Sequence, residues 1–176
     1  MRRCKKMAQM TTAKPLTRNV PDVAGVNQRK PRDERWGAYP ETVLFFAGEP
    51  EVMVDLREEV SRPTRDGLKA LGLGEPFAVL TAFNPRGVDL GDEENSARME
   101  ALERELSSSG DEFVRLDACS PDKSHCECSV ALKASRERSL DLARRWEQIA
   151  IFWWDGSAFW LYGAITEIEP LKLPLR

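Results

Sequence analysis

The sequence has few of the residues on which metal and redox chemistry depend. It contains one histidine and four cysteines among 176 residues, and four cysteines in a chain of this length do not amount to a disulfide framework. The cysteines form no C-x-x-C pair, and on a strand His125 is expected to point away from Cys126 and Cys128, so the spacing is poor for structural zinc. Idle or buried thiols are the favoured interpretation. A nucleophilic Cys119 or Cys126 is disfavoured, because a nucleophile and base that are adjacent in sequence rarely align.

The chain also lacks the segments that define several other classes of protein. No run approaches the roughly 18 apolar residues of a membrane helix, and no apolar segment follows the N-terminal charges. Gly87 and Gly91 are not followed by Gly-Lys-Ser/Thr, so they do not form a phosphate loop. The acidic residues within 89–94 lack the glycine-punctuated alternation of a calcium loop. We therefore expect a cytoplasmic protein with no metal and no cofactor.

Positive charge is concentrated at the N-terminus. Residues 1–40 hold ten Lys/Arg and three acidic residues, whereas the rest of the chain holds sixteen basic and twenty-six acidic residues. Without hydrophobic periodicity and with four prolines, residues 1–40 are predicted to form a flexible arm ahead of one domain at 41–168, and 169–176 to form a loose end. No aromatic residue precedes Trp36, which disfavours nucleic-acid binding by the arm.

Alternating patterns in the rest of the chain predict an α+β fold. Short apolar runs predict strands at 42–46, 51–56, 76–82, 113–116, 127–133, 149–154 and 159–162, with 117–125 as a polar loop. Start and stop signals predict three helices, from Pro63 to Gly72, over 93–108 and after Ser135. The order β-β-α-β-α-β-β-α-β-β predicts a single mixed or mostly antiparallel sheet of about six to seven strands, with helices over one or both faces. Polar and apolar residues alternate at 51–56, which predicts an edge strand, and Asp155-Gly156 predicts a tight hairpin turn.

A set of polar residues falls at the ends of these predicted elements, where sites on sheets usually form. Asn84 follows a buried strand, Asn95 lies in the first turn of the next helix, and Gln148 directly precedes the most apolar strand. On the strand at 127–133, the period of two puts Glu127 and Ser129 on one face. The complete candidate set is Thr81, Asn84, Asn95, Arg98, Glu127, Ser129 and Gln148.

Four spaced motifs carry a family resemblance. They are Thr81-Ala-Phe-Asn84-Pro85, Glu94-Asn95-Ser-Ala-Arg98, Pro121-Asp122 leading to Glu127-Cys-Ser129, and Leu142-Ala-Arg-Arg-Trp146-Glu147-Gln148. In this order they resemble the bacterial domain-of-unknown-function 3293 family over about residues 76–163. The chain departs from the family at two places: the family prefers an aromatic-Gly-Gln run at 146–148, and residues other than cysteine on both sides of Glu127. The resemblance implies a fold and a candidate polar site, and it brings no established activity.

The candidate set allows two interpretations. In the first, it lines a pocket for a polar or anionic, nucleotide-like small molecule, with Arg98 as the cation, Glu127 as base or counter-charge, and the amides orienting the ligand. In the second, it is an internal network in which Arg98 pairs with Glu127 and the amides satisfy loop main-chain groups. Both interpretations predict that the side chains of Arg98 and Glu127 approach each other or a shared ligand.

A third hypothesis belongs to another class of function, a non-enzymatic interaction module. The aromatic cluster at 153–160 most simply forms core and sheet face. If Trp154 and Trp160 lay exposed on one face of the hairpin, they would form a docking patch for a protein partner, together with the basic arm. The sequence does not decide whether the protein is an enzyme.

Overall fold

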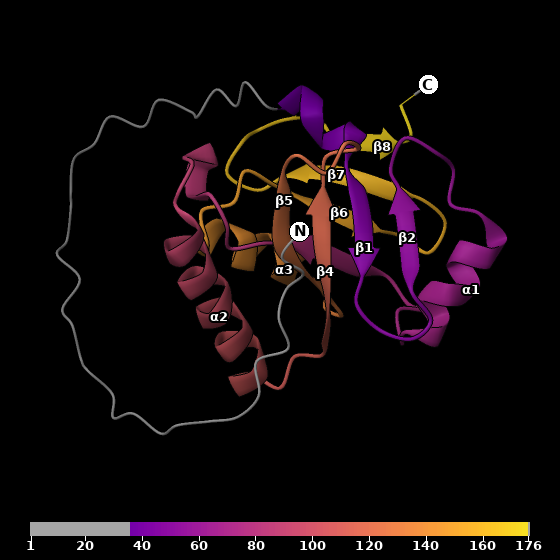
Figure 1. Cartoon of the computed structure of the whole chain (residues 1–176), viewed down its shortest axis with the longest axis horizontal. Helices are drawn as coiled ribbons and strands as arrows, with labels where there is room; N and C mark the ends of the chain where they lie inside the picture. The colour runs from indigo at the N-terminus through magenta and orange to yellow at the C-terminus, as the bar shows by residue number, and fades with distance from the viewer. Residues whose placement is uncertain (1–35, 176) are drawn as a thin grey trace, which may run out of the picture.

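The protein folds around one strongly curved antiparallel sheet (Figure 1). The computed structural model describes residues 36–175, so residues 1–35 of the predicted arm lie outside the described part of the chain. In chain order the elements are the 3-10 helix η1 (Trp36–Glu41), strands β1 (Val43–Phe46) and β2 (Val52–Asp55), helix α1 (Arg62–Ala70), strand β3 (Phe77–Leu80), the 3-10 helix η2 (Pro85–Gly87), helix α2 (Asp92–Ser108), strands β4 (Phe113–Cys119) and β5 (Cys126–Leu132), helix α3 (Arg136–Arg145), and strands β6 (Ala150–Trp154), β7 (Phe159–Gly163) and β8 (Leu171–Leu173).

The sheet has eight strands in the order β2-β1-β4-β5-β3-β6-β7-β8, and every neighbouring pair is antiparallel. The predicted α+β class with one sheet is therefore right, and the predicted count of six to seven strands is one to two short. The predicted edge strand is confirmed, because β2 lies at one end of the sheet with Val52 and Val54 buried and Met53 56% exposed. The predicted hairpin is also confirmed, with Trp154 opposite Phe159.

The eighth strand comes from the segment that was predicted to be a loose end. Strand β8 pairs with β7, which buries Leu173 and places Lys172 Nζ 5.9 Å from the centre of the Trp160 ring. Three residues between Pro170 and Pro174 are too short a run to give a strand pattern, so only tertiary pairing defines this element.

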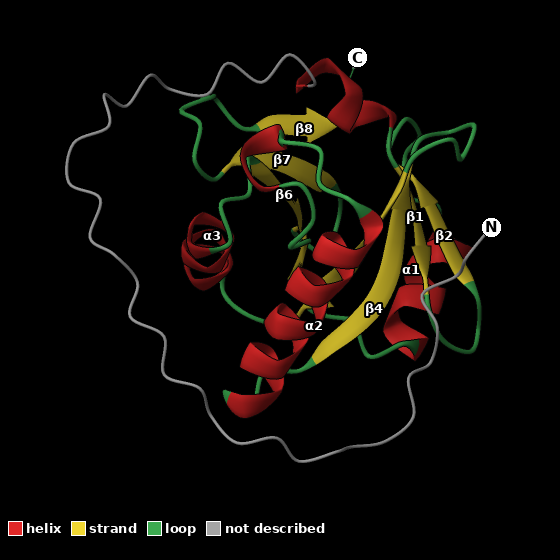
Figure 2. Ribbon diagram, turned by 60° about the vertical axis from the view of Figure 1, so that its left-hand side comes forward, coloured by secondary structure: helices red, strands yellow, loops and turns green. Residues whose placement is uncertain are grey.

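The curvature of the sheet creates an inner and an outer core. Leu44 of β1 and Leu161 of β7 belong to the same buried cluster although four strands lie between β1 and β7 in the sheet, so the sheet curls into a half-barrel around this inner core. Leu68 of α1 joins the inner core, while Leu102 of α2 and Leu142 of α3 pack against the outer face. Helices thus cover both faces, with α2 and α3 together on one side and α1 on the other (Figures 1 and 2).

Two boundaries differ from the predictions. Strand β4 continues through residues 117–119, which were predicted to be loop, because they pair with β1 and β5. Residues 36–41, mostly assigned to the arm, form η1 and pack on the domain: the Tyr39 ring lies 5.6 Å from Trp36 and 6.2 Å from Phe152, centre to centre. The three predicted α-helices are present, and η1 and η2 are additional short turns.

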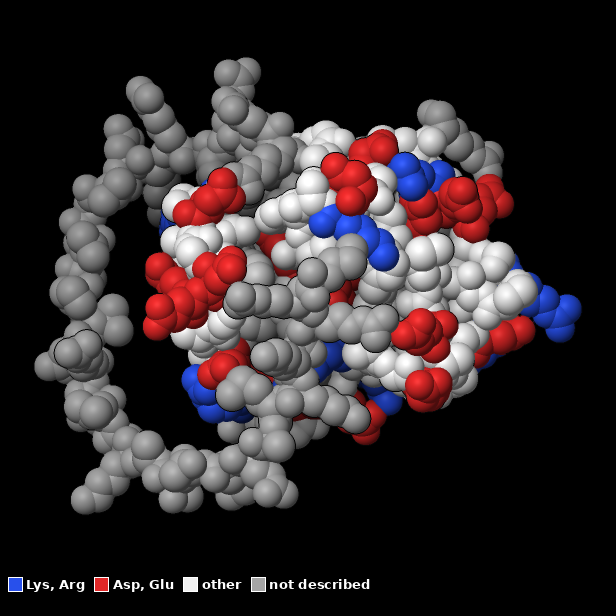
Figure 3. All heavy atoms as spheres, in the orientation of Figure 1, with Lys and Arg blue, Asp and Glu red and all other residues white. Residues whose placement is uncertain are grey.

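Helix α2 carries much of the negative charge of the domain. It begins with Asp92, Glu93 and Glu94, where the helix dipole favours anions. Acidic side chains gather over this helix at the left of Figure 3. None of the described helices is long and apolar enough to cross a membrane.

Candidate functional site

A cavity of about 160 Å³ opens at the end of the half-barrel beside η1. Three of the predicted site residues line it, together with residues from η1, the β4–β5 hairpin and β6. The lining residues are Ala38, Tyr39, Thr42, Phe83, Asn84, Gly87, Ala118, Cys119, Ser120, His125, Glu127, Gln148, Ile149 and Phe152. The cavity thus joins a polar wall to aromatic and aliphatic side chains that continue the inner core.

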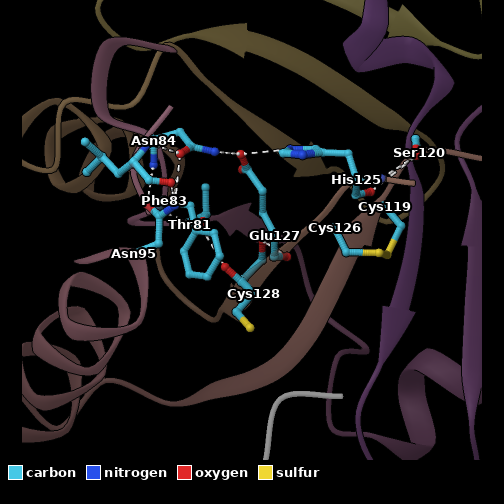
Figure 4. A network of polar contacts seen from close by, with 12 residues as sticks. Thr81, Phe83, Asn84, Asn95, Cys119, Ser120, His125, Cys126, Glu127 and Cys128 are labelled. Atoms are coloured by element: carbon cyan, nitrogen blue, oxygen red, sulfur yellow. Dashed lines mark hydrogen bonds and ion pairs between the residues drawn. A yellow bond between two sulfur atoms is a disulfide. The ribbon is translucent and has the colours of Figure 1, made fainter. Parts of the chain in front are cut away.

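Glu127 is the acidic residue of this wall. Its Oε1 atom accepts a hydrogen bond from Asn84 Nδ2 at 2.7 Å and lies 3.2 Å from His125 Nε2 (Figure 4). Within residues 36–175 its second oxygen, Oε2, makes no hydrogen bond, and the side chain is 22% exposed. The carboxylate is therefore oriented through one oxygen, and the other is left for water or a ligand.

Asn84 is held by the main chain in a fixed orientation. It adopts a left-handed conformation (φ 47°), which asparagine tolerates better than most residues. Leu90 N–H donates to Asn84 Oδ1 at 3.0 Å, and Asn95 Nδ2 donates to the same oxygen. Because Oδ1 must receive these donors, Nδ2 must be the atom that faces Glu127.

Gln148 is held in the same manner at the end of α3. The helix ends in a Schellman motif, in which Glu147 N–H donates to Arg144 O and Gln148 N–H donates to Ala143 O. Glu147 adopts the left-handed conformation (φ 59°) that this motif requires at its turning residue. The Gln148 side chain is 7% exposed, and its Nε2 donates to Phe83 O at 2.9 Å and Trp146 O at 3.3 Å.

Arg98 lies outside the cavity, and its predicted ion pair with Glu127 is wrong. Its Nε donates to Ala82 O at 2.8 Å, one terminal nitrogen donates to Trp146 O at 3.0 Å, and the guanidinium lies 5.5 Å from the centre of the Trp146 ring. No contact joins Arg98 to Glu127 in the described part of the chain. The reason is topological: α2 packs on the outer face of the sheet, whereas Glu127 lines the cavity at the end of the inner core.

The remaining predicted residues support the loops around the cavity. Thr81 Oγ1 donates to Cys128 O at 2.7 Å and accepts from Phe83 N–H at 3.0 Å, which fixes the start of the loop after β3. Asn95 is buried and binds the same loop. Ser129 is also buried, and its hydroxyl donates to Glu127 O at 3.3 Å. The predicted set is thus brought to one region, but only Asn84, Glu127 and Gln148 reach the cavity.

The sequence analysis missed two groups of cavity residues. His125 was considered only as a zinc ligand or base, although its spacing of two residues from Glu127 at the start of a strand could have indicated a shared face. Tyr39 and Ala38 lay in the segment assigned to the arm, and nothing in their sequence pattern separates them from it.

The prediction of idle thiols is wrong for Cys119 and Cys126, which form a disulfide with their Cα atoms 4.1 Å apart. The two residues lie opposite each other in the β4–β5 register. The bond therefore clamps the hairpin loop that carries Ser120 and His125 to the cavity (Figure 4). It also removes both thiolates from any zinc site, and no group of three His, Cys, Asp or Glu residues suited to a metal gathers among residues 36–175.

Asp122 organises the same loop. Its Oδ1 accepts hydrogen bonds from the hydroxyls of Ser120 and Ser124 and from Ser124 N–H. These bonds, with the Ser120 hydroxyl first, hold the pKa of Asp122 at about 2. The loop is thus ordered by its own contacts as well as by the disulfide.

A larger hollow of about 510 Å³ lies elsewhere on the sheet and offers less chemistry. It is lined by Leu71, Gly72, Asp111, Glu112, Phe113, Val114 and Lys133. Its charged groups already have partners, since Lys133 pairs with Glu112 and Asp111 pairs with Arg138. The smaller cavity therefore remains the stronger candidate.

The Trp-rich hairpin does not present the two tryptophans together. Trp154 is 3% exposed and packs in the inner core against Phe77 and Phe159. Trp160 occupies the opposite face, where its indole N–H donates to Asp155 at 2.7 Å. Trp154 is therefore unavailable for the docking patch considered above.

Comparison with known proteins gives a family match to the segment that carries the polar wall. No curated protein and no solved structure matches the chain. The model of the family described as "Protein of unknown function (DUF3293)" matches residues 80–151, a segment that contains all seven predicted site residues. The match confirms over this segment the resemblance that the four motifs indicated.

Proposed function

We propose that the protein binds a small polar molecule in the cavity beside η1, with Glu127 as its principal contact. The observation that carries the proposal is the state of the Glu127 carboxylate. One oxygen is bound by Asn84 and His125, and the other has no partner within residues 36–175. A partly buried carboxylate is costly unless it is hydrogen-bonded. A ligand that donates a hydrogen bond to Glu127 Oε2 therefore gains a strong contact with an acceptor that is already oriented.

The surroundings of Glu127 support binding more than a purely internal network. Asn84 and Gln148 are anchored by main-chain groups, so the wall is formed before any ligand arrives and little ordering is needed on binding. Phe83 and Phe152 offer apolar surface to the same cavity. A few oriented polar groups within a largely apolar lining are typical of small-molecule sites.

The size of the cavity limits the ligand. A cavity of about 150 Å³ holds one benzene-sized ring, and sites for drug-sized molecules start at about 300 Å³. At about 160 Å³ the cavity suits one ring or a group of that size, and a whole nucleotide would extend outside it. Arg98 is bound to the main chain, so among the described residues the lining lacks the cation expected for an anionic ligand. The geometry favours binding and assigns no reaction.

A fragment screen by two-dimensional ¹H–¹⁵N NMR on the full chain tests this function. We expect fragments to shift the main-chain amides of Phe83, Gly87 and Glu127, and the Glu127→Gln variant to weaken these shifts. The amides of Gly72 and Lys133, in the larger hollow, serve as an internal control. A broad library that shifts no resonance of the cavity would overturn the proposal.

A further inference from the structure

We infer that the cavity selects a ligand with a planar, donor-bearing cationic head, such as an amidinium or guanidinium group. This inference rests on the proposed function and specifies the chemical class of its ligand. It replaces the polar or anionic ligand that the sequence suggested. Three observations carry it: Gln148 Oε1 has no donor among the described residues, Glu127 Oε2 has none either, and the lining contains a carboxylate.

Gln148 presents a buried acceptor. Both hydrogens of its amide nitrogen are directed at carbonyl oxygens, those of Phe83 and Trp146. Flipping the amide would place Oε1 against these two oxygens, so the orientation is fixed. Among residues 36–175 nothing donates to Gln148 Oε1, although the side chain is only 7% exposed and lines the cavity. A buried acceptor without a donor costs free energy, and a donor on the ligand removes that cost.

Glu127 presents the second acceptor. Asn84 cannot turn its own oxygen toward the carboxylate, because Leu90 N–H and Asn95 Nδ2 hold Asn84 Oδ1 on the other side (Figure 4). Asn84 Nδ2 therefore binds Oε1, and Oε2 has no donor from the described residues. The side chains of Asn84, Glu127 and Gln148 therefore offer a ligand two acceptors, Glu127 Oε2 and Gln148 Oε1. They offer one donor, the second hydrogen of Asn84 Nδ2.

The charge of the lining decides between a cation and an anion. Among residues 36–175, the lining includes one carboxylate, Glu127, with His125 beside its Oε1 atom, and it includes no lysine and no arginine. Arg98, the arginine that the sequence placed in this site, donates to Ala82 O and Trp146 O. An anion would meet Glu127 without a fixed counter-charge, whereas a cation gains a charge-assisted hydrogen bond. The aromatic faces of Phe83 and Phe152 are compatible with a planar cation.

Three probes of nearly the same shape separate the alternatives. Benzamidinium is cationic and only donates hydrogen bonds, benzamide is neutral and both donates and accepts, and benzoate is anionic and only accepts. We measure their dissociation constants by NMR titration of the full chain, following the cavity amides and the side-chain amide of Gln148. We expect benzamidinium to bind tightest, with an advantage over benzoate of roughly tenfold or more.

Two variants assign the effect to the carboxylate. Glu127→Gln should weaken benzamidinium roughly tenfold or more and benzamide much less, because it removes the charge and keeps the shape. Glu93→Gln, which removes an exposed carboxylate in the first turn of α2, should change neither constant. A Tm measured on both variants establishes that they are folded.

Each other outcome counts against the inference. Tighter binding of benzoate, or equal binding of all three probes, overturns the donor class and leaves cavity binding standing. If none of the probes shifts the cavity resonances, the ligand class is wrong. In that case the fragment screen decides separately whether the cavity binds any ligand.

Discussion

Asn84 and Asn95 exchange two hydrogen bonds across the gap between the end of β3 and the first turn of α2. The main-chain N–H of Asn84 donates to Asn95 Oδ1 at 2.9 Å, and Asn95 Nδ2 donates to Asn84 Oδ1 at 3.0 Å. Asn95 Nδ2 also reaches Leu90 O at 3.1 Å. One buried side chain therefore closes the loop that carries Asn84 to the cavity.

Replacing Asn95 should be costly for this reason. In Asn95→Ala, the Asn84 N–H and the Leu90 carbonyl lose their partners, and each unsatisfied buried group costs about 1–3 kcal/mol. We expect the free energy of unfolding in denaturant melts to fall by about 3 kcal/mol. Ser96→Ala, at the neighbouring exposed position, is the matched control and should stay within about 0.5 kcal/mol of the wild type. Equal effects of the two substitutions would contradict the role assigned to Asn95.

A double-mutant cycle tests the separation of Arg98 from Glu127. Arg98→Met removes two hydrogen bonds from a charged group to carbonyls and should cost about 2–3 kcal/mol of unfolding free energy. Glu127→Gln keeps an acceptor for Asn84 and should change stability by less than about 1 kcal/mol. Because the two side chains share no partner, the coupling energy should be below about 0.5 kcal/mol. A coupling energy of several kcal/mol would instead indicate that Arg98 and Glu127 form an ion pair.

Glu147 occupies a left-handed position (φ 59°), a conformation that glycine adopts without steric cost. A residue with a Cβ atom pays about 1–2 kcal/mol in this conformation. Glycine avoids that cost but loses more backbone entropy on folding and the exposed contact to Arg86. We expect Glu147→Gly to raise the free energy of unfolding by up to about 1 kcal/mol.

The same substitution can be made in an Arg86→Ala background, where the exposed ion pair is already absent. The gain from Glu147→Gly should be larger there by about 0.5 kcal/mol. A marked loss of stability in both backgrounds, measured by chemical denaturation, would show that the turn does not have the conformation described.

The Cys119–Cys126 disulfide should stabilise the hairpin through the entropy of the unfolded chain. A bond that closes a loop with a sequence separation of 7 is worth about 2–3 kcal/mol in the chain-entropy model. We expect the double variant Cys119→Ala/Cys126→Ala to be less stable than the wild type by about this amount without reductant. With a phosphine reductant present, the two proteins should differ by much less. An unchanged difference would mean that side-chain packing, and not the cross-link, is responsible.

Asp155 should make stability depend on pH at low pH. Burial raises the pKa of Asp155, but hydrogen bonds from Ala158 N–H, the Trp160 indole, and the hydroxyl and N–H of Ser157 outweigh burial and hold it at about 2. The unfolded value is about 3.9. A lowered pKa in the folded state gives stability that is present above the unfolded value and is lost as pH falls through the folded value.

The measurement compares the wild type with Asp155→Asn, which keeps an acceptor oxygen and loses the charge. The stability difference should be constant between about pH 5 and 8 and should shrink between about pH 4 and 2. A difference that is undiminished at about pH 2 would show that the charge of Asp155 is not its source.

The sequence predicted the elements better than their edges. The three helices and the strands of the central sheet carry apolar patterns of sufficient length, and these were found within one or two residues at most boundaries. Strand β8 and helix η1 were missed because Leu171–Leu173 and Trp36–Glu41 gain their order from contacts with distant segments. The hydrophobic pattern also does not predict the register in which two strands pair. Without the β4–β5 register, the sequence did not indicate that Cys119 lies opposite Cys126.

The sequence predicted which region of the fold holds the candidate site, but it did not predict which side chains contact one another there. The period of two placed Glu127 on one face, but it did not say whether that face met α2 or the inner core. Arg98 was misassigned because its partners are carbonyl oxygens of Ala82 and Trp146. Every residue carries such an oxygen, so no residue type marks them in a sequence. Charge pairs are visible in a sequence, which is why Glu127 looked like the partner.

The carbonyl of Trp146 receives hydrogen bonds from both Arg98 and Gln148. Together with the oxygens of Ala82 and Phe83, it makes the scaffold of the cavity depend on the path of the backbone and not on the side chains at these three positions. Only a change that redirects the chain, such as proline, would remove these acceptors. A substitution at Phe83 would therefore alter the apolar lining of the cavity and leave the carbonyl acceptors of its scaffold in place.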